Sequence, residues 1–117
     1  MTLQKQKRIK SKAITNSARG ENCTLRIYGV CNGNPETTVF AHAKGGGMGM
    51  KAHDIHGCYA CSSCHEWIDG GWTRPMGEGI GIQAREKHKH QAIMESEVLR
   101  AMMKTQTILF QKGLIKL

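Results

Sequence analysis

Five cysteines stand out in this chain of 117 residues, because two of them form a C-x2-C pair that a histidine follows directly. This CSSCH motif occupies residues 61–65, and its spacing is typical of metal ligation by thiolates. Four thiolates hold zinc in a closed tetrahedral site. The candidate ligands of a structural zinc ion are Cys23, Cys31, Cys61 and Cys64. The alternative is that these cysteines are packed core residues, and Cys58 is either a spare ligand or a core residue of that kind.

Two histidines near these cysteines have the pattern of a nuclease site. His42 ends a run that favours a strand, and His65 follows the C-x2-C pair on a predicted helix. In a one-metal ββα nuclease site, one imidazole takes a proton from water, while the other side of the site binds a divalent metal. Asp54 and Asp69 are the nearby carboxylates that would complete the shell of Mg²⁺ or Mn²⁺, because hard cations prefer oxygen ligands. Each of these histidines, taken singly, also fits a structural role.

The charge and composition favour an anionic partner and exclude a membrane-spanning helix. Lys and Arg outnumber Asp and Glu by 17 to 9, which gives a net charge of +8. No apolar run is long enough to cross a bilayer. Aromatic residues make up only 5%, so a domain of this size would gain stability from a bound metal ion. The first 22 residues lack the apolar segment of a secretory signal, and we therefore expect a cytoplasmic protein with reduced thiols.

Basic side chains are the candidates for contact with a phosphate backbone. Residues 1–20 contain six of them and no acidic residue, which fits either a DNA-binding arm, flexible or helical, or a solubilising tail. We divide the chain into this arm and a domain over residues 21–117. The predicted nucleic-acid contacts are Lys5, Lys7, Arg8, Lys10, Lys12, Lys44 and Lys51.

A predicted hairpin and two predicted helices must position these side chains. Alternating apolar residues predict a strand over 23–31, a turn follows at 32–35, and the β-rich run 37–43 predicts the second strand of the hairpin. The glycine-rich residues 44–50 predict a loop.

The first predicted helix lies within residues 59–69, where the serine pair 62–63 suits its N-cap and the glycine pair 70–71 would end it. Apolar residues at three-to-four-residue spacing predict a longer helix from 85 to about 111, which Gly113 ends. The apolar stripe of this helix is compatible with a homodimer.

Three strings in the sequence resemble the YbcO type of small phage and prophage nucleases. They are GVCNGNPETTVFAH at 29–42, GMGMK at 47–51 and YACSSCHEWIDG at 59–70. The resemblance covers roughly residues 17–117. It implies an α+β fold of the HNH-like ββα-metal group, which also contains the Ref-type, RecA-dependent nuclease domain. The expected architecture is a small zinc-stapled ββα-metal domain with a C-terminal helix and a basic N-terminal arm.

The resemblance also implies roles for single residues. His42 matches the general-base position of the HNH pattern, His65 matches the helix position that binds the catalytic metal, and Asp54 falls where the family usually has an aspartate. HNH enzymes usually carry a metal ligand directly before the base, where this chain has Ala41. This departure would move the missing ligand onto Asp54 or Asp69.

Two functions follow from these observations as hypotheses. The first is a metal-dependent endodeoxyribonuclease of phage or prophage origin, with a role in DNA recombination or repair and a recombinase filament as a candidate partner. The second is a non-catalytic, zinc-stabilised DNA-binding accessory module, which the net charge would serve as well. A weaker third hypothesis is a protein-interaction module. Dependence on added Mg²⁺ or Mn²⁺ separates the first hypothesis from the second.

Overall fold

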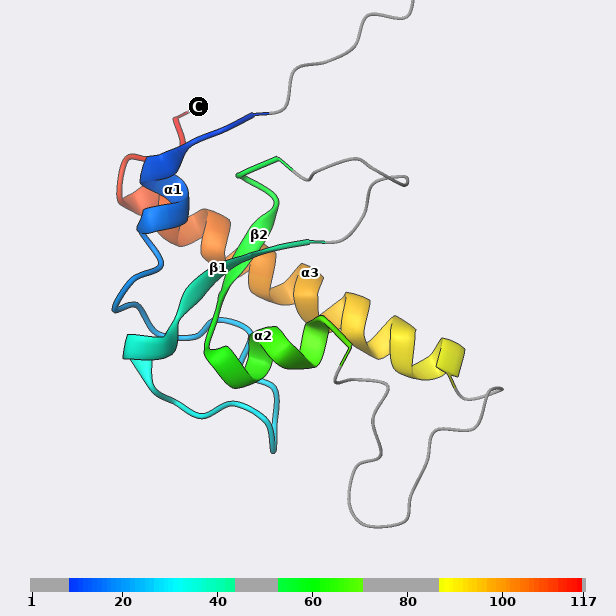
Figure 1. The fold of residues 1–117 in the computed structure, drawn as a ribbon. Coiled ribbons are helices and arrows are strands. Elements are labelled where there is room, and N and C mark those ends of the chain that lie inside the picture. The colour runs from blue at the N-terminus through cyan, green and yellow to red at the C-terminus, as the bar shows by residue number, and fades with distance from the viewer. Residues whose placement is uncertain (1–8, 44–52, 71–86, 117) are drawn as a thin grey trace, which may run out of the picture.

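The fold is that of a computed structural model, which describes residues 9–43, 53–70 and 87–116. It is an α+β fold, as the sequence predicted, with the sheet in the middle of the molecule, the longest helix crossing it and two short helices nearby (Figure 1). The elements in chain order are α1 (Lys12–Asn16), the 3-10 turn η1 (Pro35–Thr37), β1 (Val39–His42), β2 (Gly57–Ala60), α2 (Ser62–Ile68) and α3 (Lys87–Gln111).

The sheet has two antiparallel strands within the described residues, and its register places His42 opposite Gly57. All four residues of β2 are buried, since α3 covers this strand. A Cβ atom on Gly57 would lie 2.5 Å from the ring of Phe40 and 2.6 Å from the carbonyl oxygen of Ala41. Glycine at this position therefore allows the end of β1 to approach β2 closely.

The predicted hairpin between residues 23–31 and 37–43 is wrong. The second of these runs does contain β1, but its partner is β2, and residues 23–31 form no strand. The backbone N–H groups that a strand would use have other acceptors here. Those of Thr24 and Leu25 donate to the carbonyl oxygen of Tyr59, at 2.8 and 3.2 Å. Those of the next two residues donate to cysteine sulfurs.

The N-cap of α2 also differs from the prediction. Cys61 is the cap, because its Sγ accepts the backbone N–H of Cys64 at 3.4 Å, and Ser62 and Ser63 are the first residues of the helix itself. Tyr59 and Ala60, which the sequence placed at the helix entrance, belong to β2.

The prediction for α3 is confirmed, since the helix ends at Gln111 and Gly113 has a φ of +76°. Its buried side chains recur at three-to-four-residue spacing, as amphipathic packing requires: Val98, Ala101, Thr105 and Leu109. Ile93, Leu99, Met103 and Phe110 are half exposed on the same helix. The homodimer that the apolar stripe suggested stays a prediction.

The second half of the predicted basic arm is packed against the domain. α1 lies there, and Ile14 and Ala18 form a core cluster with Phe40, Tyr59 and Leu109. Ser17 Oγ lies 2.7 Å from the hydroxyl of Tyr59, which fastens α1 to β2. Residues 1–8 lie outside the described residues, as does the predicted loop at 44–50. No helix within the described ranges has the length and apolar content that crossing a membrane requires.

Candidate metal centre and candidate active site

The four cysteines that the sequence singled out converge on one point. Their Sγ atoms all lie within 4.8 Å of one another, although the segments that carry them are some 30 residues apart in sequence. Cys31 Sγ and Cys61 Sγ are 3.8 Å apart. A tetrahedral site with Zn–S bonds of about 2.3 Å has sulfur atoms roughly 3.8 Å apart. The donor set and its spacing therefore fit zinc.

Backbone N–H groups surround these sulfurs and favour their ionised form. Cys23 Sγ accepts from Arg26 at 3.3 Å, and Cys64 Sγ accepts from Ile27 at 3.4 Å. Cys61 Sγ accepts from Asn32 at 3.5 Å. The hydrogen bond from Cys64 and the one from Arg26 lower the pKa of the Cys23 thiol to about 4, against the opposing effect of burial, whereas the bond to Cys23 raises the pKa of Cys64 and burial raises the pKa of Cys31. Thiolate is the form that binds a metal, so the surroundings suit a metal centre.

Cys58 stands apart from the cluster. It is fully buried in β2 within the apolar core, and burial raises the pKa of its thiol to about 12. A neutral thiol in an apolar core behaves as a small hydrophobic side chain. The structure therefore decides between the two roles left open for this cysteine in favour of the core residue.

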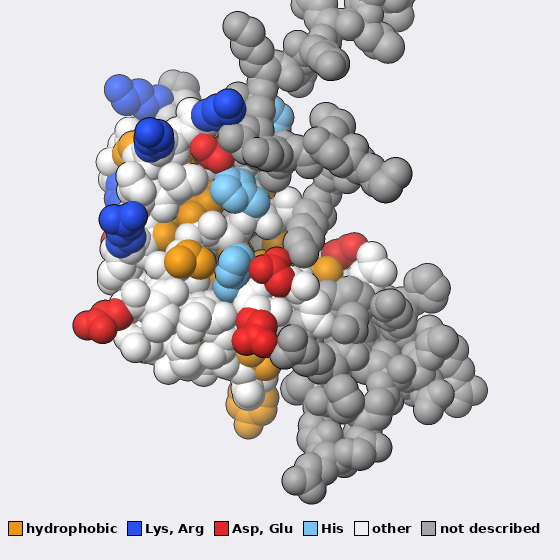
Figure 2. Space-filling view, in the orientation of Figure 1, with side chains coloured by type: hydrophobic (Ala, Val, Ile, Leu, Met, Phe, Trp, Pro, Cys, Tyr) orange, Lys and Arg blue, Asp and Glu red, His pale blue; other side chains and the backbone are white. Residues whose placement is uncertain are grey.

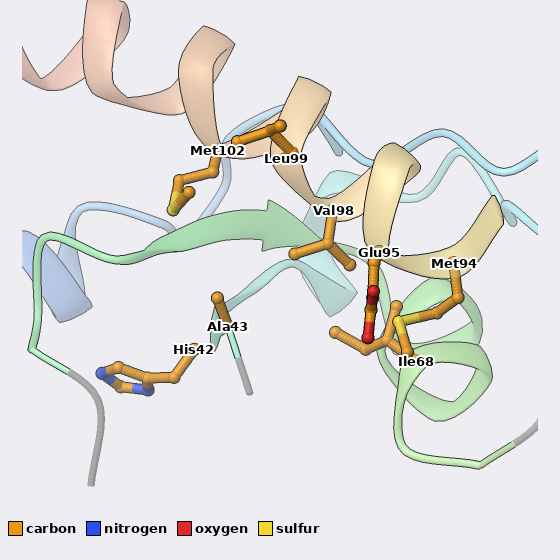
Figure 3. A pocket seen from close by; sticks show the side chains of 8 residues that line it. All are labelled: His42, Ala43, Ile68, Met94, Glu95, Val98, Leu99 and Met102. Carbon is orange, nitrogen blue, oxygen red and sulfur yellow. The ribbon is translucent and has the colours of Figure 1, made fainter. Parts of the chain in front are cut away.

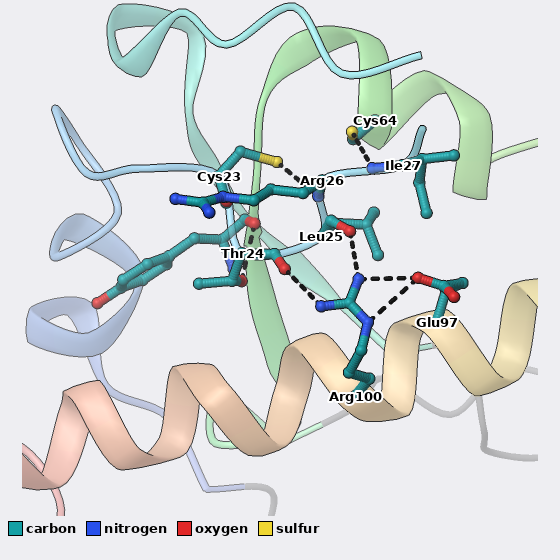
Figure 4. A network of polar contacts seen from close by, with 9 residues as sticks. Cys23, Thr24, Leu25, Arg26, Ile27, Cys64, Glu97 and Arg100 are labelled. Carbon is teal, nitrogen blue, oxygen red and sulfur yellow. Dashed lines mark hydrogen bonds and ion pairs between the residues drawn. The ribbon is translucent and has the colours of Figure 1, made fainter. Parts of the chain in front are cut away.

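Arg100 of α3 braces the segment that carries Cys23 (Figure 4). Its guanidinium donates to the backbone carbonyl oxygens of Thr24 at 3.3 Å and Leu25 at 2.5 Å, and it pairs with Glu97 at 2.8 Å. The Thr24 hydroxyl reaches α3 as well, with its oxygen 2.8 Å from that of Thr105. Sequence reasoning missed this brace, because an exposed arginine on a helix gives no sign of the carbonyl groups it will meet.

His42 and Asp54 form a pair at the end of β1. His42 Nε2 lies 2.8 Å from Asp54 Oδ1, and the other carboxylate oxygen accepts the backbone N–H of Ser11 at 2.6 Å. The aspartate is buried, whereas the imidazole is about one-third exposed. An ionised carboxylate can only accept, so Nε2 carries a proton, and in a neutral imidazole of this tautomer the lone pair lies on Nδ1. The sequence predicted Asp54 as a metal ligand, and in the structure its carboxylate pairs with His42.

His65 and Asp69 form a second pair on the exposed side of α2. His65 Nε2 lies 3.4 Å from Asp69 Oδ2, and both side chains are nearly half exposed. The four-cysteine cluster is the single group of three or more converging ligand atoms among the residues that the structure describes. The catalytic-metal role of His65, Asp54 and Asp69 thus stays a prediction.

A small apolar cavity of about 130 Å³ opens beside His42 (Figure 3). Ala43, which directly follows β1, and Ile68 of α2 line it together with apolar residues of α3, and Glu95 is the single acidic residue in its wall. The imidazole of His42 lies at one end and the carboxylate of Glu95 points toward Ile68 at the other. The end of β1, α2 and α3 therefore meet beside His42.

The face in Figure 2 carries histidine and acidic side chains together, with lysine and arginine side chains along the side where α1 lies. Lys10 and Lys12, two of the predicted nucleic-acid contacts, are exposed, and Lys12 is the first residue of α1. The other predicted contacts, Lys5, Lys7, Arg8, Lys44 and Lys51, lie outside the described residues.

Comparison with known proteins gives a consistent result. Residues 12–114 match a protein-family model described as "Putative nuclease YbcO". The curated protein "Putative nuclease YbcO" of Escherichia coli strain K12 is 38% identical over 107 residues, which cover 88% of this chain and 96% of that protein. "Putative nuclease ybcO" of Enterobacteria phage 82 has the same identity and coverage.

A solved structure resembles the fold as well. It is titled "Structure of a putative bacteriophage protein from Escherichia coli str. K-12 substr. MG1655" and superimposes with a TM-score of 0.61 at 34% identity. The match covers 85% of this chain and 98% of that structure, so the similarity extends over the arrangement of elements described above.

Proposed function

Because this chain belongs to the YbcO family, we propose that it is a metal-dependent endonuclease that hydrolyses phosphodiester bonds in DNA. The observation that carries the proposal is the His42–Asp54 pair at 2.8 Å, which fixes an imidazole at the end of β1 and, within the part of the chain that the structure describes, leaves Nδ1 without a hydrogen-bond partner. A fixed imidazole of this kind is suited to take a proton from an attacking water.

Asp54 supports the base in two ways. Its bond to Nε2 selects the tautomer whose Nδ1 accepts a proton, and its negative charge stabilises the imidazolium that forms. The carboxylate is itself held by the backbone N–H of Ser11 and is buried. Asp54 is thus a positioning residue for His42 in this proposal.

The divalent ion of the proposal would bind at His65 and Asp69, with water as the remaining ligands. When bound, Mg²⁺ or Mn²⁺ stabilises the negative charge that develops on the phosphate and the leaving oxygen. The ββα order of β1, β2 and α2 places His42 and His65 on neighbouring elements, which supports an HNH-like reading of this region. The four cysteines would hold a structural zinc ion beside it.

The net charge of +8 and the exposed Lys10 and Lys12 support DNA as the substrate, since cations near the surface attract a phosphate backbone. We further propose a role in recombination or repair with a recombinase filament as partner. This part rests on the phage relatives and on the resemblance to the Ref-type domain.

A nicking assay on supercoiled and single-stranded DNA tests the proposal, with Mg²⁺ and Mn²⁺ titrated over the purified protein. We expect His42→Ala to lower the cleavage rate about 10²- to 10⁴-fold, as loss of a general base does, with DNA binding unchanged. His56→Ala is the matched control, because this histidine is exposed in the segment next to Asp54. The variant should cleave DNA at the wild-type rate. Cleavage by His42→Ala at the wild-type rate contradicts the assigned mechanism.

A zinc-stabilised DNA-binding accessory module is the second candidate. One observation favours it: His65 and Asp69 supply only two ligands, because Asp54 is engaged with His42 and Ser11. This candidate predicts DNA binding without cleavage at every Mg²⁺ or Mn²⁺ concentration, also when a recombinase filament is added.

A further inference from the structure

Tyr28 is the most exposed large side chain of the described residues. Its exposed fraction is 98%, while the other tyrosine of the chain, Tyr59, is fully buried. Water around a free aromatic ring is unfavourable, so a ring with no contact in the folded domain is a candidate for contact with another molecule.

Hydrogen bonds hold the backbone on both sides of Tyr28 and so fix the point from which its side chain projects. The carbonyl oxygen of Ile27 accepts the backbone N–H groups of Val30 at 3.0 Å and Cys31 at 2.9 Å, which closes a tight turn. Ile27 is buried, and its own N–H donates to Cys64 Sγ. Gly29 adopts a φ of +77°, which the turn requires and glycine allows. The ring therefore projects from a turn that the cysteine cluster anchors.

One positive charge lies near Tyr28, that of Arg26. An open concavity of about 420 Å³ lies beside the ring; Asn22, Arg26, Gly29 and Gly33 line it together with Cys23, Ile27 and Cys31. Arg26 is exposed, and no acidic residue occurs between Asn22 and Pro35. In Figure 1 this segment, between α1 and η1, forms a long loop that extends past α2.

We infer that Tyr28 stacks on an unpaired base of single-stranded DNA, with Arg26 beside it to contact the backbone phosphate. This inference rests on the proposed function for the choice of DNA, and it adds the class of substrate. An exposed ring on a positively charged platform is how proteins bind single strands without reading their sequence. The bases of an intact duplex are stacked on one another and offer no free face to the ring.

The same surroundings argue against a protein partner. Residues that dominate protein interfaces are ringed by contacts that exclude water, and their pockets are well packed. Around Tyr28 the exposed neighbours are asparagine, arginine and glycine. A base and its phosphate match such a surface better, because the base needs a ring and the phosphate needs a cation.

Binding of fluorescein-labelled DNA tests the inference, measured by anisotropy with the full chain purified with its metal and without added Mg²⁺ or Mn²⁺. The probes are a mixed-sequence 20-nucleotide strand and the same strand in a duplex. We expect Tyr28→Ala to weaken binding of the single strand about tenfold, the usual effect of removing one stacking ring, and to change duplex binding less than about twofold. Tyr28→Trp should bind the single strand at least as tightly as the wild type.

Two further comparisons make the result specific. Phe110→Ala removes a half-exposed ring from α3 and should leave binding of both probes unchanged. Raising the salt concentration weakens all variants, but the ratio between Tyr28→Ala and wild type should stay constant, because stacking is not ionic. Thermal unfolding of Tyr28→Ala should match the wild type, since the ring has no contacts to lose.

The inference is wrong if Tyr28→Ala binds the single strand as the wild type does, if it loses duplex affinity equally, or if the wild type binds no single strand. The nuclease test is independent of these outcomes. Stacking by Tyr28 without any cleavage would leave the inference standing and remove the proposed function. Cleavage that depends on His42 with no effect of Tyr28 would do the opposite.

Discussion

The cysteine cluster and the histidine side of this protein, which carries the pairs His42–Asp54 and His65–Asp69, meet on one short helix. They differ in exposure, because the thiols are mostly buried and the imidazoles reach solvent. Cys64 and His65 are consecutive residues of α2, and the first is fully buried, whereas the side chain of the second is 41% exposed. Successive residues of a helix point about 100° apart, so one helix can anchor through one side chain and present the next to solvent.

The chemical difference between the two sides is one of saturation. The cysteine side combines four thiols, backbone N–H donors and a nearly complete shield from solvent. A closed set of four ligands stabilises a fold and leaves no position for substrate. The histidine side has two partly exposed histidines, His42 and His65, and each of them pairs with an aspartate. Open positions of this kind are what a reacting site needs.

The largest effect on stability should come from removing one of the four thiols of the cysteine cluster. Cys64→Ser replaces a thiolate with a hydroxyl of nearly the same size that does not ligate zinc. Structural zinc contributes about 10–16 kcal/mol in small zinc domains, which is as large as the whole stability of a typical domain of about 5–15 kcal/mol. We expect this variant to lose its zinc and its cooperative unfolding transition, measured by elemental analysis and circular dichroism.

Cys58→Ala is the control for that variant, because it removes another fully buried thiol from the same core without touching the cluster. It should retain one zinc ion per chain and lose only about 1 kcal/mol of stability. Equal zinc loss from both variants would show that the cluster does not act as a separate closed site.

The next largest effect, on the cleavage rate, should come from a change at the His42–Asp54 pair on the histidine side. Asp54→Asn keeps the hydrogen bond from Ser11 if its oxygen faces that N–H, but the amide nitrogen then faces His42 and donates to Nε2. The imidazole proton moves to Nδ1, where it blocks proton transfer from water. We expect the cleavage rate to fall about 100-fold or more, while zinc content and the dissociation constant for DNA stay at their wild-type values.

A double variant separates positioning from a general structural role. If Asp54 acts through His42, adding Asp54→Asn to His42→Ala costs little further activity, because residues that act as one unit are not additive. Full additivity of the two losses would mean that the aspartate acts on something other than this histidine.

Sequence reasoning predicted the parts of this architecture that depend on residue type and short spacing. The cysteine types identified the cluster, and the three-to-four-residue spacing of Val98, Ala101, Thr105 and Leu109 identified α3 and its buried face. Both signals are local, or they follow from a chemical preference that few side chains share. For this reason they can be read from a single chain.

The features that sequence reasoning missed depend on long-range hydrogen bonds. Residues 23–31 alternate like a strand, but their N–H groups bind sulfur and the carbonyl oxygen of Tyr59, so no strand forms. The pairing of Asp54 with His42 likewise depends on the end of β1 lying beside the start of β2, where Gly57 allows their close approach. Spacing along the chain carries no information on which of several nearby groups an aspartate will meet.

The smallest of the expected effects tests how far the cysteine cluster depends on Arg100 of α3. Arg100→Gln removes the guanidinium that holds the carbonyl oxygens of Thr24 and Leu25, next to Cys23 of the cysteine cluster. These bonds are partly exposed, so we expect a loss of about 1 kcal/mol in the free energy of unfolding. The ligands would keep their identity but lose part of their orientation, and zinc affinity should fall about tenfold in competition with a chelator.

Lys104→Gln is the matched control, because it removes a positive charge from an exposed position one turn further along α3. It should change neither stability nor zinc affinity beyond the error of the measurement. If Arg100→Gln also leaves zinc affinity unchanged, the four thiols and their backbone N–H donors fix the metal geometry by themselves. The cysteine cluster would then be independent of Arg100, whereas the histidine side still needs β1, β2 and the Asp54 segment in place together.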